Sequence, residues 1–216
     1  MSESRGCCGA DKFVPPKVSA PGGASKLLLH CCCAPCSCAI VETLLANGIR
    51  PAMFFFNPNI FPYGEYEKRR QECRRHAEMS GLEFIEASAD YPACRAAWLD
   101  CVRGLESEPE RGARCARCFE FRLRATAAFA AENGFGCVAT TLSSSRWKDL
   151  GQIERAGESA VSAFPGLDFW GRNWRKEGLQ NRRNALIKQF GFYNQSYCGC
   201  EFSMKKQNSM TEETTL

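Results

Sequence analysis

KLLLHCCCAPCSCAIVETLLANG, residues 26–48, contains the strand, loop and helix that decide the fold. The apolar run at 26–30 is short and continuous, as in a buried strand, and 40–48 has helical spacing that ends at Asn47-Gly48. The pattern repeats, with strands predicted within 52–59, 82–87 and 137–142 and helices at 65–81, 93–105, 118–134, 150–163 and 181–190. This alternation predicts an α/β fold with a Rossmann-like, doubly wound, mostly parallel sheet and a C-terminal helical segment.

The chain of 216 residues is long enough for one sizeable core, and a single domain is expected over residues 26–204. The ends, 1–25 and 205–216, are rich in small and polar residues and are predicted to be disordered tails. No apolar stretch is long enough to span a bilayer, and the N-terminus lacks the features of a secretory signal. The expected location is the cytoplasm.

Fifteen cysteines are the anomaly of the composition. The number is odd and no export signal accompanies it, so a secreted disulfide framework is not expected. Many thiols in a reducing compartment point to metal binding or redox-active cysteines. The net charge of +4 is too small to indicate a nucleic-acid-binding protein by itself.

The unusual stretches of the sequence follow the predicted strands. The cysteine-rich loop 30–38 follows the first strand, 57–66 the second, 89–94 the third and 140–148 the fourth. Ligands of open α/β sheets bind beyond the carboxyl ends of the strands. These loops are therefore expected to lie together at one functional edge.

Three groups of closely spaced cysteines are candidate metal ligands: Cys32, Cys33 and Cys36 in the first loop, Cys115 and Cys118 in RCARCF, and Cys198 and Cys200 in YCGCEF. A CxxC motif that enters a helix brings two thiolates together at the helix N-terminus. The two pairs alone fit either structural zinc or an iron–sulfur cluster. Seven thiols exceed the four of tetrahedral zinc and leave room for a second metal or a reactive thiol pair.

The remaining cysteines and the histidines are given structural roles. Alternation at the strand end should turn Cys31 away from Cys32, and Cys38 is also left outside the site. Lone cysteines are expected to be small buried apolar residues: Cys73, Cys94, Cys101 and Cys137. His30 is expected to be structural rather than catalytic, and His76 to be solvated in a charged helix.

Several rare motifs in a fixed order resemble the cobalamin-independent epoxyqueuosine reductase family. They are LLLHCCCAPCS, FFFNPNIFPYGEYEKR, EPERGARCARCFEFRL, TTLSSSRWK and YNQSYCGCEFS, and together they extend from about residue 26 to about residue 203. The resemblance implies the reduction of epoxyqueuosine to queuosine at the wobble position of tRNA anticodons, the last step of that modification. It also implies a fold related to the PP-loop nucleotide-hydrolase superfamily and a [4Fe-4S] cluster beside a mononuclear iron.

The resemblance carries all seven thiols over as ligands. It suggests Cys33, Cys115, Cys118 and Cys198 for the cluster, and Cys32, Cys36 and Cys200 as catalytic ligands of the iron. The additional Cys31 and Cys38 depart from the common pattern. No SGGxDS phosphate loop follows the first strand, so an ATP-dependent step is not expected. An external electron donor is implied.

Basic residues are concentrated between 172 and 188. With the resemblance, phosphate contacts are predicted at Arg172, Arg175, Lys176, Arg182 and Arg183, and stacking on Trp170 and Trp174. A solvated helix face is the alternative. Polar residues of the second and fourth loops are candidates for a substrate pocket: Asn57, Asn59, Tyr63, Glu65, Tyr66, Arg69, Ser143, Ser144 and Lys148.

Two other functions remain open at this point. A tRNA thiolation or sulfur-relay enzyme would use adjacent cysteines as persulfides and would depend on ATP. A zinc-binding RNA module would be colourless and would have no catalytic activity.

Overall fold

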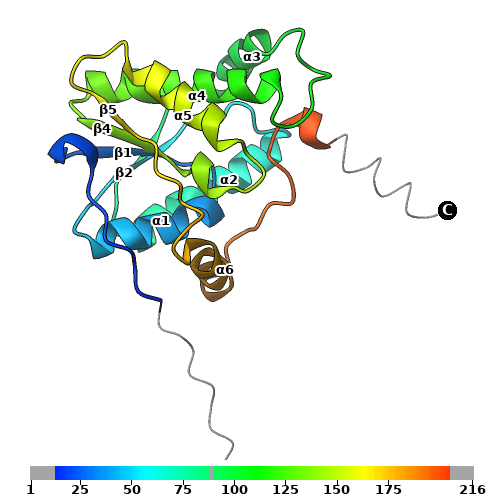
Figure 1. Cartoon of the computed structure of the whole chain (residues 1–216). Helices are drawn as coiled ribbons and strands as arrows, with labels where there is room; N and C mark the ends of the chain where they lie inside the picture. The colour runs from blue at the N-terminus through cyan, green and yellow to red at the C-terminus, as the bar shows by residue number, and fades with distance from the viewer. Residues whose placement is uncertain (1–12, 88–89, 205–216) are drawn as a thin grey trace, which may run out of the picture.

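A parallel sheet of five strands forms the centre of the protein (Figure 1). The computed structural model describes residues 13–87 and 90–204. The strands are β1 (Leu27–His30), β2 (Ala52–Phe55), β3 (Phe84–Glu86), β4 (Cys137–Thr140) and β5 (Asp168–Trp170). Their order across the sheet is β3-β2-β1-β4-β5, and every neighbouring pair is parallel. The prediction of a doubly wound α/β fold is confirmed.

The strand order reverses between β1 and β4, which lie side by side in the middle of the sheet. Residue pairs run from Leu27 opposite Cys137 to His30 opposite Thr140, so both strands end at the same level. A crevice beyond such a reversal point is where open α/β sheets bind ligands. The loop that begins with Cys31 starts at this point.

Helices cover both faces of the sheet (Figure 1). One face carries α1 (Ala34–Ala46), α2 (Tyr63–Met79) and α6 (Leu179–Phe190). The other carries α4 (Ala113–Glu132) and α5 (Leu150–Val161), with α3 (Tyr91–Cys101) beside α4. Short 3-10 helices occur at Pro21–Gly23 and Thr141–Ser144.

Side-chain alternation along β1 divides the core into two layers. Leu27 and Leu29 pack with α1, α2 and α6, whereas Leu28 packs with α4 and α5. Because successive side chains of a strand point to opposite faces, the residues that follow β1 inherit this alternation. Cys31 accordingly belongs to the first layer, and Cys32 to the second.

The structure adds a strand and lengthens two predicted helices. Strand β5 has only three residues and begins at the exposed Asp168, so it lacks the apolar run that marks the other strands. Helix α1 begins at Ala34 rather than at residue 40, and α4 begins at Ala113 rather than at residue 118. Both earlier starts place cysteines in the first helical turn.

Part of the predicted N-terminal tail is held against the core. Asn47 accepts a hydrogen bond from the backbone N–H of Val18 at 3.2 Å and donates one to the carbonyl of Pro16 at 2.9 Å. Phe13 and Val18 pack against the α1 layer. The tail prediction is therefore wrong for residues 13–25, while residues 1–12, with Cys7 and Cys8, and 205–216 lie outside the described residues.

Within residues 13–87 and 90–204, no helix has both the length and the apolar character needed to cross a membrane.

Candidate metal centre

Three buried thiols lie together where β1 meets α1. The sulfurs of Cys32, Cys33 and Cys36 are all within 4.8 Å of one another, and those of Cys32 and Cys33 are 3.8 Å apart. Cys33 is the N-cap residue of α1, and Pro35 in the first turn fixes the helix start. Cys36 is three residues after Cys33, which brings both side chains to the same side of the helix end. The positive end of the helix dipole favours thiolates there.

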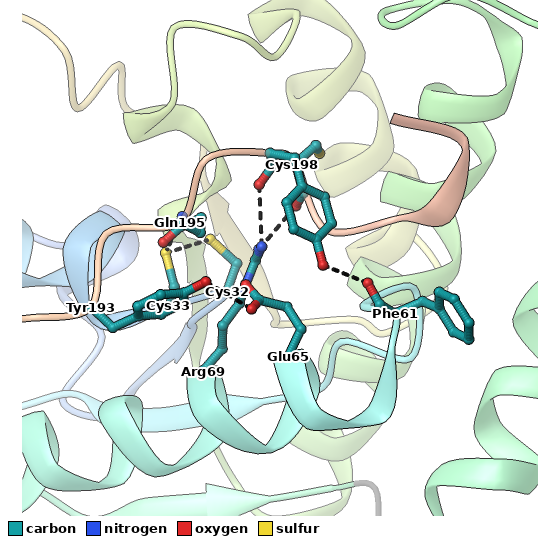
Figure 2. Close-up of polar contacts among 9 residues, drawn as sticks. Cys32, Cys33, Phe61, Glu65, Arg69, Tyr193, Gln195 and Cys198 are labelled. Atoms are coloured by element: carbon teal, nitrogen blue, oxygen red, sulfur yellow. Dashed lines mark hydrogen bonds and ion pairs between the residues drawn. The ribbon is translucent and has the colours of Figure 1, made fainter. Parts of the chain in front are cut away.

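Neighbouring polar groups donate hydrogen bonds to two of these sulfurs. The Thr141 hydroxyl lies 3.5 Å from Sγ of Cys32, and Thr141 Oγ1 also accepts from the backbone N–H of Cys32 at 3.2 Å. The side-chain amide of Gln195 donates to Sγ of Cys33 at 2.9 Å (Figure 2). Donors of this kind stabilise a thiolate and orient it.

The three thiols cannot all ionise easily without a cation. Hydrogen bonds from Cys33 and Cys36 lower the pKa of Cys32 well below its usual value. Burial raises the pKa of Cys33 well above its usual value, and the hydrogen bond with Cys32 raises the pKa of Cys36 to about 11. One thiolate is thus favoured, and its neighbours stay protonated because like charges repel at short range. A bound metal ion would reverse this balance.

A second group of thiols forms beside the N-terminus of α4. Cys115 and Cys118 lie in the first turns of the helix, and the backbone N–H of Arg111 donates to Sγ of Cys115 at 3.3 Å. Cys118 and Cys200 pack in one cluster with Trp98. Burial raises the pKa of Cys115 to about 11, and the charges of Cys198, Cys118 and Cys200 act in the same direction. Packing thus joins Cys118 to Cys200, and Cys115 and Cys198 line one small hollow.

A chain of hydrogen bonds connects the two thiol-bearing helix starts. Arg122 of α4 donates from Nε to the carbonyl of Cys118 at 3.2 Å and from Nη1 to Oδ1 of Asn57 at 3.2 Å. The amide of Asn57 then donates to the carbonyl of Cys31 at 2.9 Å. All these contacts are buried, so they fix the distance between the two groups of cysteines.

The C-terminal segment 193–200 is anchored to α2 by one guanidinium (Figure 2). Arg69 donates to Oε1 of Glu65 at 2.7 Å and to the carbonyls of Cys198 and Tyr197 at 3.1 and 3.2 Å. Glu65 accepts a further bond from the hydroxyl of Tyr193 at 2.8 Å. The ion pair is buried, and it holds the backbone that carries Cys198 and Cys200.

Gly199 lets this segment pass close to Arg69. Its φ is 125°, and an added Cβ would lie 3.0 Å from Nη1 of Arg69 and 3.2 Å from a side-chain carbon of Ile60. The carbonyl of Gly199 accepts from the N–H of Phe61 at 2.8 Å. Only glycine readily adopts this backbone conformation, so the CxC spacing depends on it.

A cavity of about 250 Å³ opens above the thiols. Cys32, Cys36 and Cys198 line it, together with the buried Lys148. Burial alone would lower the pKa of Lys148, but the charges of Cys198, Cys32 and Cys36 raise it. A small ligand in this cavity could therefore reach the cysteine side chains at the reversal point of the sheet.

The comparison with known proteins identifies the family of the chain. A sequence model of the family described as "Epoxyqueuosine reductase QueH" matches residues 27–206. The chain belongs to the QueH family. It is 43% identical over 202 residues to the epoxyqueuosine reductase QueH of Haemophilus influenzae, an alignment that covers 94% of this chain and 81% of the relative.

Other QueH relatives align over similar lengths. The Acinetobacter baylyi protein is 43% identical, with 89% of this chain and 86% of the relative aligned. The Thermotoga maritima protein is 35% identical, with 87% of this chain and 94% of the relative aligned. Both are named epoxyqueuosine reductase QueH. The aligned length contains all seven candidate ligands, since the family model spans Cys32 to Cys200.

The other cysteines of this QueH protein lie mostly where the sequence placed them. Cys31 and Cys38 are buried in the α1 layer, whereas Cys32, Cys33 and Cys36 belong to the other layer. Cys73 and Cys137 are fully buried, as predicted, whereas Cys94 and Cys101 are only half-buried because α3 is a peripheral helix. Every cysteine within residues 13–87 and 90–204 is a free thiol, so no disulfide is formed there.

Both histidines of this QueH protein are buried and hydrogen-bonded. His30 links β1 to Oγ1 of Thr140 at 2.9 Å and to the carbonyl of Phe56 at 3.2 Å, contacts that agree with the expected structural role. The prediction that His76 is solvated is wrong, because its ring packs against Phe192 and bonds to Ser37. Burial lowers the pKa of each histidine to about 4.

Most of the predicted RNA-binding arginines have protein partners. Arg172 pairs with Glu177, Arg182 pairs with Glu42, and Arg175 donates to the carbonyls of Ser143 and Lys148. Arg183 lines the cavity and Lys176 is exposed, so these two remain well placed for an RNA backbone. RNA binding by this set stays a prediction.

The predicted stacking on Trp170 and Trp174 is wrong. Both indoles are buried in the core of the α1 layer and pack edge to face, so neither can receive a base.

The predicted polar pocket is assembled only in part. Arg69, Ser144 and Lys148 line the cavity. The remaining candidates serve the framework or lie elsewhere: Asn57, Asn59, Glu65, Tyr66 and Ser143 are buried, and Tyr63 belongs to a different hollow next to Tyr91. Sequence reasoning missed Thr141, Gln195 and Arg122, which have no local motif and become significant only through contacts with distant cysteines.

Proposed function

We propose that this protein is an epoxyqueuosine reductase that converts epoxyqueuosine to queuosine in tRNA. Membership of the QueH family supports the reaction, because its relatives carry this name. The observation that carries the proposal in the structure is the cavity, which is lined by three cysteine thiols and a buried lysine. Thiol ligands below an opening of this size suit a redox reaction on a small polar group.

The seven cysteines fit a [4Fe-4S] cluster and an adjacent iron. Thiolates are the usual protein ligands of iron–sulfur clusters, and a bound cation would lower the raised pKa values of the Cys33, Cys36 and Cys115 thiols. When bound, the iron centres would supply electrons and a Lewis acid for opening the epoxide. Thr141 and Gln195 would orient the thiolates, as their bonds to Cys32 and Cys33 indicate.

Proximity favours a different partition of ligands from the one that the resemblance suggested. Cys33 lies with Cys32 and Cys36, whereas Cys200 packs with Cys118. We therefore assign Cys32, Cys33 and Cys36 to the single iron. The [4Fe-4S] cluster is assigned to Cys115, Cys118, Cys198 and Cys200. Only Cys33 and Cys200 exchange places relative to the sequence-based assignment.

The charge of the cavity lining supports a substrate attached to RNA. Its lining includes four cationic side chains, Arg69, Arg146, Lys148 and Arg183, and the described residues contribute no carboxylate to it.

The electrons would come from an external donor. An ATP-dependent step is not part of the proposal, because the cysteine loop occupies the position after β1 where a phosphate loop would lie. Free cysteines suit the reducing cytoplasm.

Metal analysis and an activity assay on the same sample test this function. Protein prepared anaerobically should be brown, should contain iron and sulfide, and should convert epoxyqueuosine in tRNA to queuosine with a chemical reductant and without ATP. Colourless protein that is active with zinc alone would contradict the redox centre. Activity that requires ATP and transfers sulfur would support a thiolation enzyme instead.

A further inference from the structure

Trp147 is the exposed aromatic residue at the entrance of the cavity. Its side chain is 44% exposed, whereas Trp98, Trp170 and Trp174, the other tryptophans of the chain, are buried. Trp147 lines the cavity together with Cys32 and Cys198, and it also lines a smaller hollow that includes Cys115. The indole therefore lies at the border between the two groups of thiols.

Two arginines hold the loop that carries Trp147 by donating hydrogen bonds to its backbone carbonyls. Arg111 donates to the carbonyls of Arg146 and Trp147 at 2.9 and 3.1 Å, and Arg175 donates to those of Ser143 and Lys148 at 3.1 and 2.7 Å. The carbonyl of Arg111 itself accepts a bond from the Gln152 amide at 2.7 Å. An exposed indole on a backbone with so many fixed carbonyls is preorganised for binding, because little motion has to be lost when a ligand arrives.

Two arginines line the cavity together with Trp147, while Glu110 lines only the smaller hollow. Arg146 is exposed next to it, and Arg183 of α6 also faces the cavity. The guanidinium of Arg183 is positioned by Oδ1 of Asn184 and Oδ1 of Asn194, at 3.1 and 3.2 Å, which are neutral partners that leave its charge uncompensated. An aromatic face in a cavity that cations line suits unpaired nucleotides, which have a flat base and an anionic backbone.

We propose that Trp147 is the stacking residue for a splayed anticodon nucleotide, with Arg146 and Arg183 contacting the adjacent phosphates. This inference rests on the proposed function, since it names how the RNA substrate of the same site is held. The base would lie against the indole at the entrance, so that the modified group of the wobble nucleotide can reach the thiols that line the cavity. Trp147 thereby replaces Trp170 and Trp174 as the aromatic contact.

Fluorescence measures the stacking directly. The probe is a synthetic anticodon stem-loop RNA with guanosine at the wobble position, titrated into the anaerobic holoprotein. We expect RNA to quench the emission of the wild type and to have no such effect on Trp147→Phe, because the remaining tryptophans are buried. Trp147→Ala should weaken RNA binding roughly tenfold, and Trp147→Phe should restore most of the affinity. Equal quenching in the wild type and Trp147→Phe would overturn the proposal.

Matched variants separate this role from stability and from general charge. Leu99→Ala removes a similarly exposed apolar side chain on α3 and should leave binding unchanged. Arg146→Gln and Arg183→Gln should each reduce the slope of log affinity against log salt concentration by about one. Arg50→Gln is the control and should leave this slope unchanged, because Arg50 lies next to the start of β2, at the opposite end of the strands from the cavity. Unchanged salt slopes for Arg146→Gln and Arg183→Gln would contradict the phosphate contacts.

The assay with epoxyqueuosine-containing tRNA distinguishes the two proposals. If the wild type binds and stacks RNA but never forms queuosine, the proposed reaction fails while the stacking site stands. If the wild type is active and Trp147→Ala keeps the wild-type KM, the stacking inference fails while the reaction stands. The expected outcome is an active wild type and a KM for tRNA that rises roughly tenfold in Trp147→Ala.

Discussion

Arg69 donates a hydrogen bond from Nη1 to the backbone carbonyl of Cys198 at 3.1 Å, across 129 positions of sequence. The same guanidinium is buried in an ion pair with Glu65 on α2. The segment that carries Cys198 and Cys200 is thus fixed to a helix that follows the second strand (Figure 2). The position of Cys198 and Cys200 therefore depends on Arg69, a residue outside the cysteine groups.

Replacing Arg69 with Met should destabilise the protein and release the CxC segment. The substitution leaves Glu65 buried without its cation and frees the carbonyls of Tyr197 and Cys198, so we expect the free energy of unfolding to fall by roughly 3 kcal/mol. The iron and sulfide content of anaerobic protein should fall with it. Arg70→Met is the control, because its ion pairs with Glu67 and Glu86 are partly exposed and contribute about 1 kcal/mol or less. Equal effects of the two substitutions would contradict the anchoring role.

The sequence alone predicts which loops lie together at the carboxyl ends of the strands, because apolar runs, loops and helices alternate with clear local signals. The cysteine groups stand out for the same reason: their spacing is local. The anchoring by Arg69 and the hydrogen bond from Gln195 to Cys33 have no local signal, since each joins residues more than a hundred positions apart. The same holds for Arg175, since the sequence does not show that this side chain is engaged by the carbonyls of Ser143 and Lys148.

Gly199→Ala should distort the CxC segment. The native φ of 125° is strained for any residue with a Cβ, and the added carbon would approach Arg69 to 3.0 Å. We expect a loss of about 1–3 kcal/mol in the free energy of unfolding and a reduced sulfide content. Gly64→Ala is the matched control: Gly64 lies in α2 and an added Cβ meets nothing within 4 Å, so this variant should be as stable as the wild type or slightly more stable. A Gly199→Ala protein with full stability and normal metal content would contradict this prediction, because it would show that the segment accommodates a Cβ at this position.

Cys33→Ser decides how the thiols are divided. If Cys33 holds the single iron with Cys32 and Cys36, the variant should lose about one iron per protein, retain sulfide and visible absorption, and lose turnover. If Cys33 holds the cluster, sulfide and colour should disappear together. Cys200→Ser should show the opposite behaviour to Cys33→Ser, because Cys200 packs with Cys118. Cys101→Ser, on α3 outside the site, should change neither iron nor sulfide.

His76 should make the protein sensitive to mild acid. Its ring is buried between α2, Ser37 and Phe192, and burial lowers its pKa from 6.5 to about 4. The unfolded chain therefore binds a proton at higher pH than the folded protein does. Stability is fully present above about pH 6.5, falls as the pH drops and stops falling below about pH 4, with a total of roughly 3 kcal/mol.

His76→Gln removes this titration while retaining an amide that can bond to Ser37. We expect the decrease in the free energy of unfolding between about pH 7 and about pH 5 to be roughly 2 kcal/mol smaller in this variant than in the wild type. Urea unfolding at the two pH values measures it, and His30, which titrates in the same direction, is common to both proteins and cancels in the comparison. Identical pH dependence in the two proteins would mean that His76 is protonated in the folded state as easily as in the unfolded chain, which its burial against Phe192 argues against.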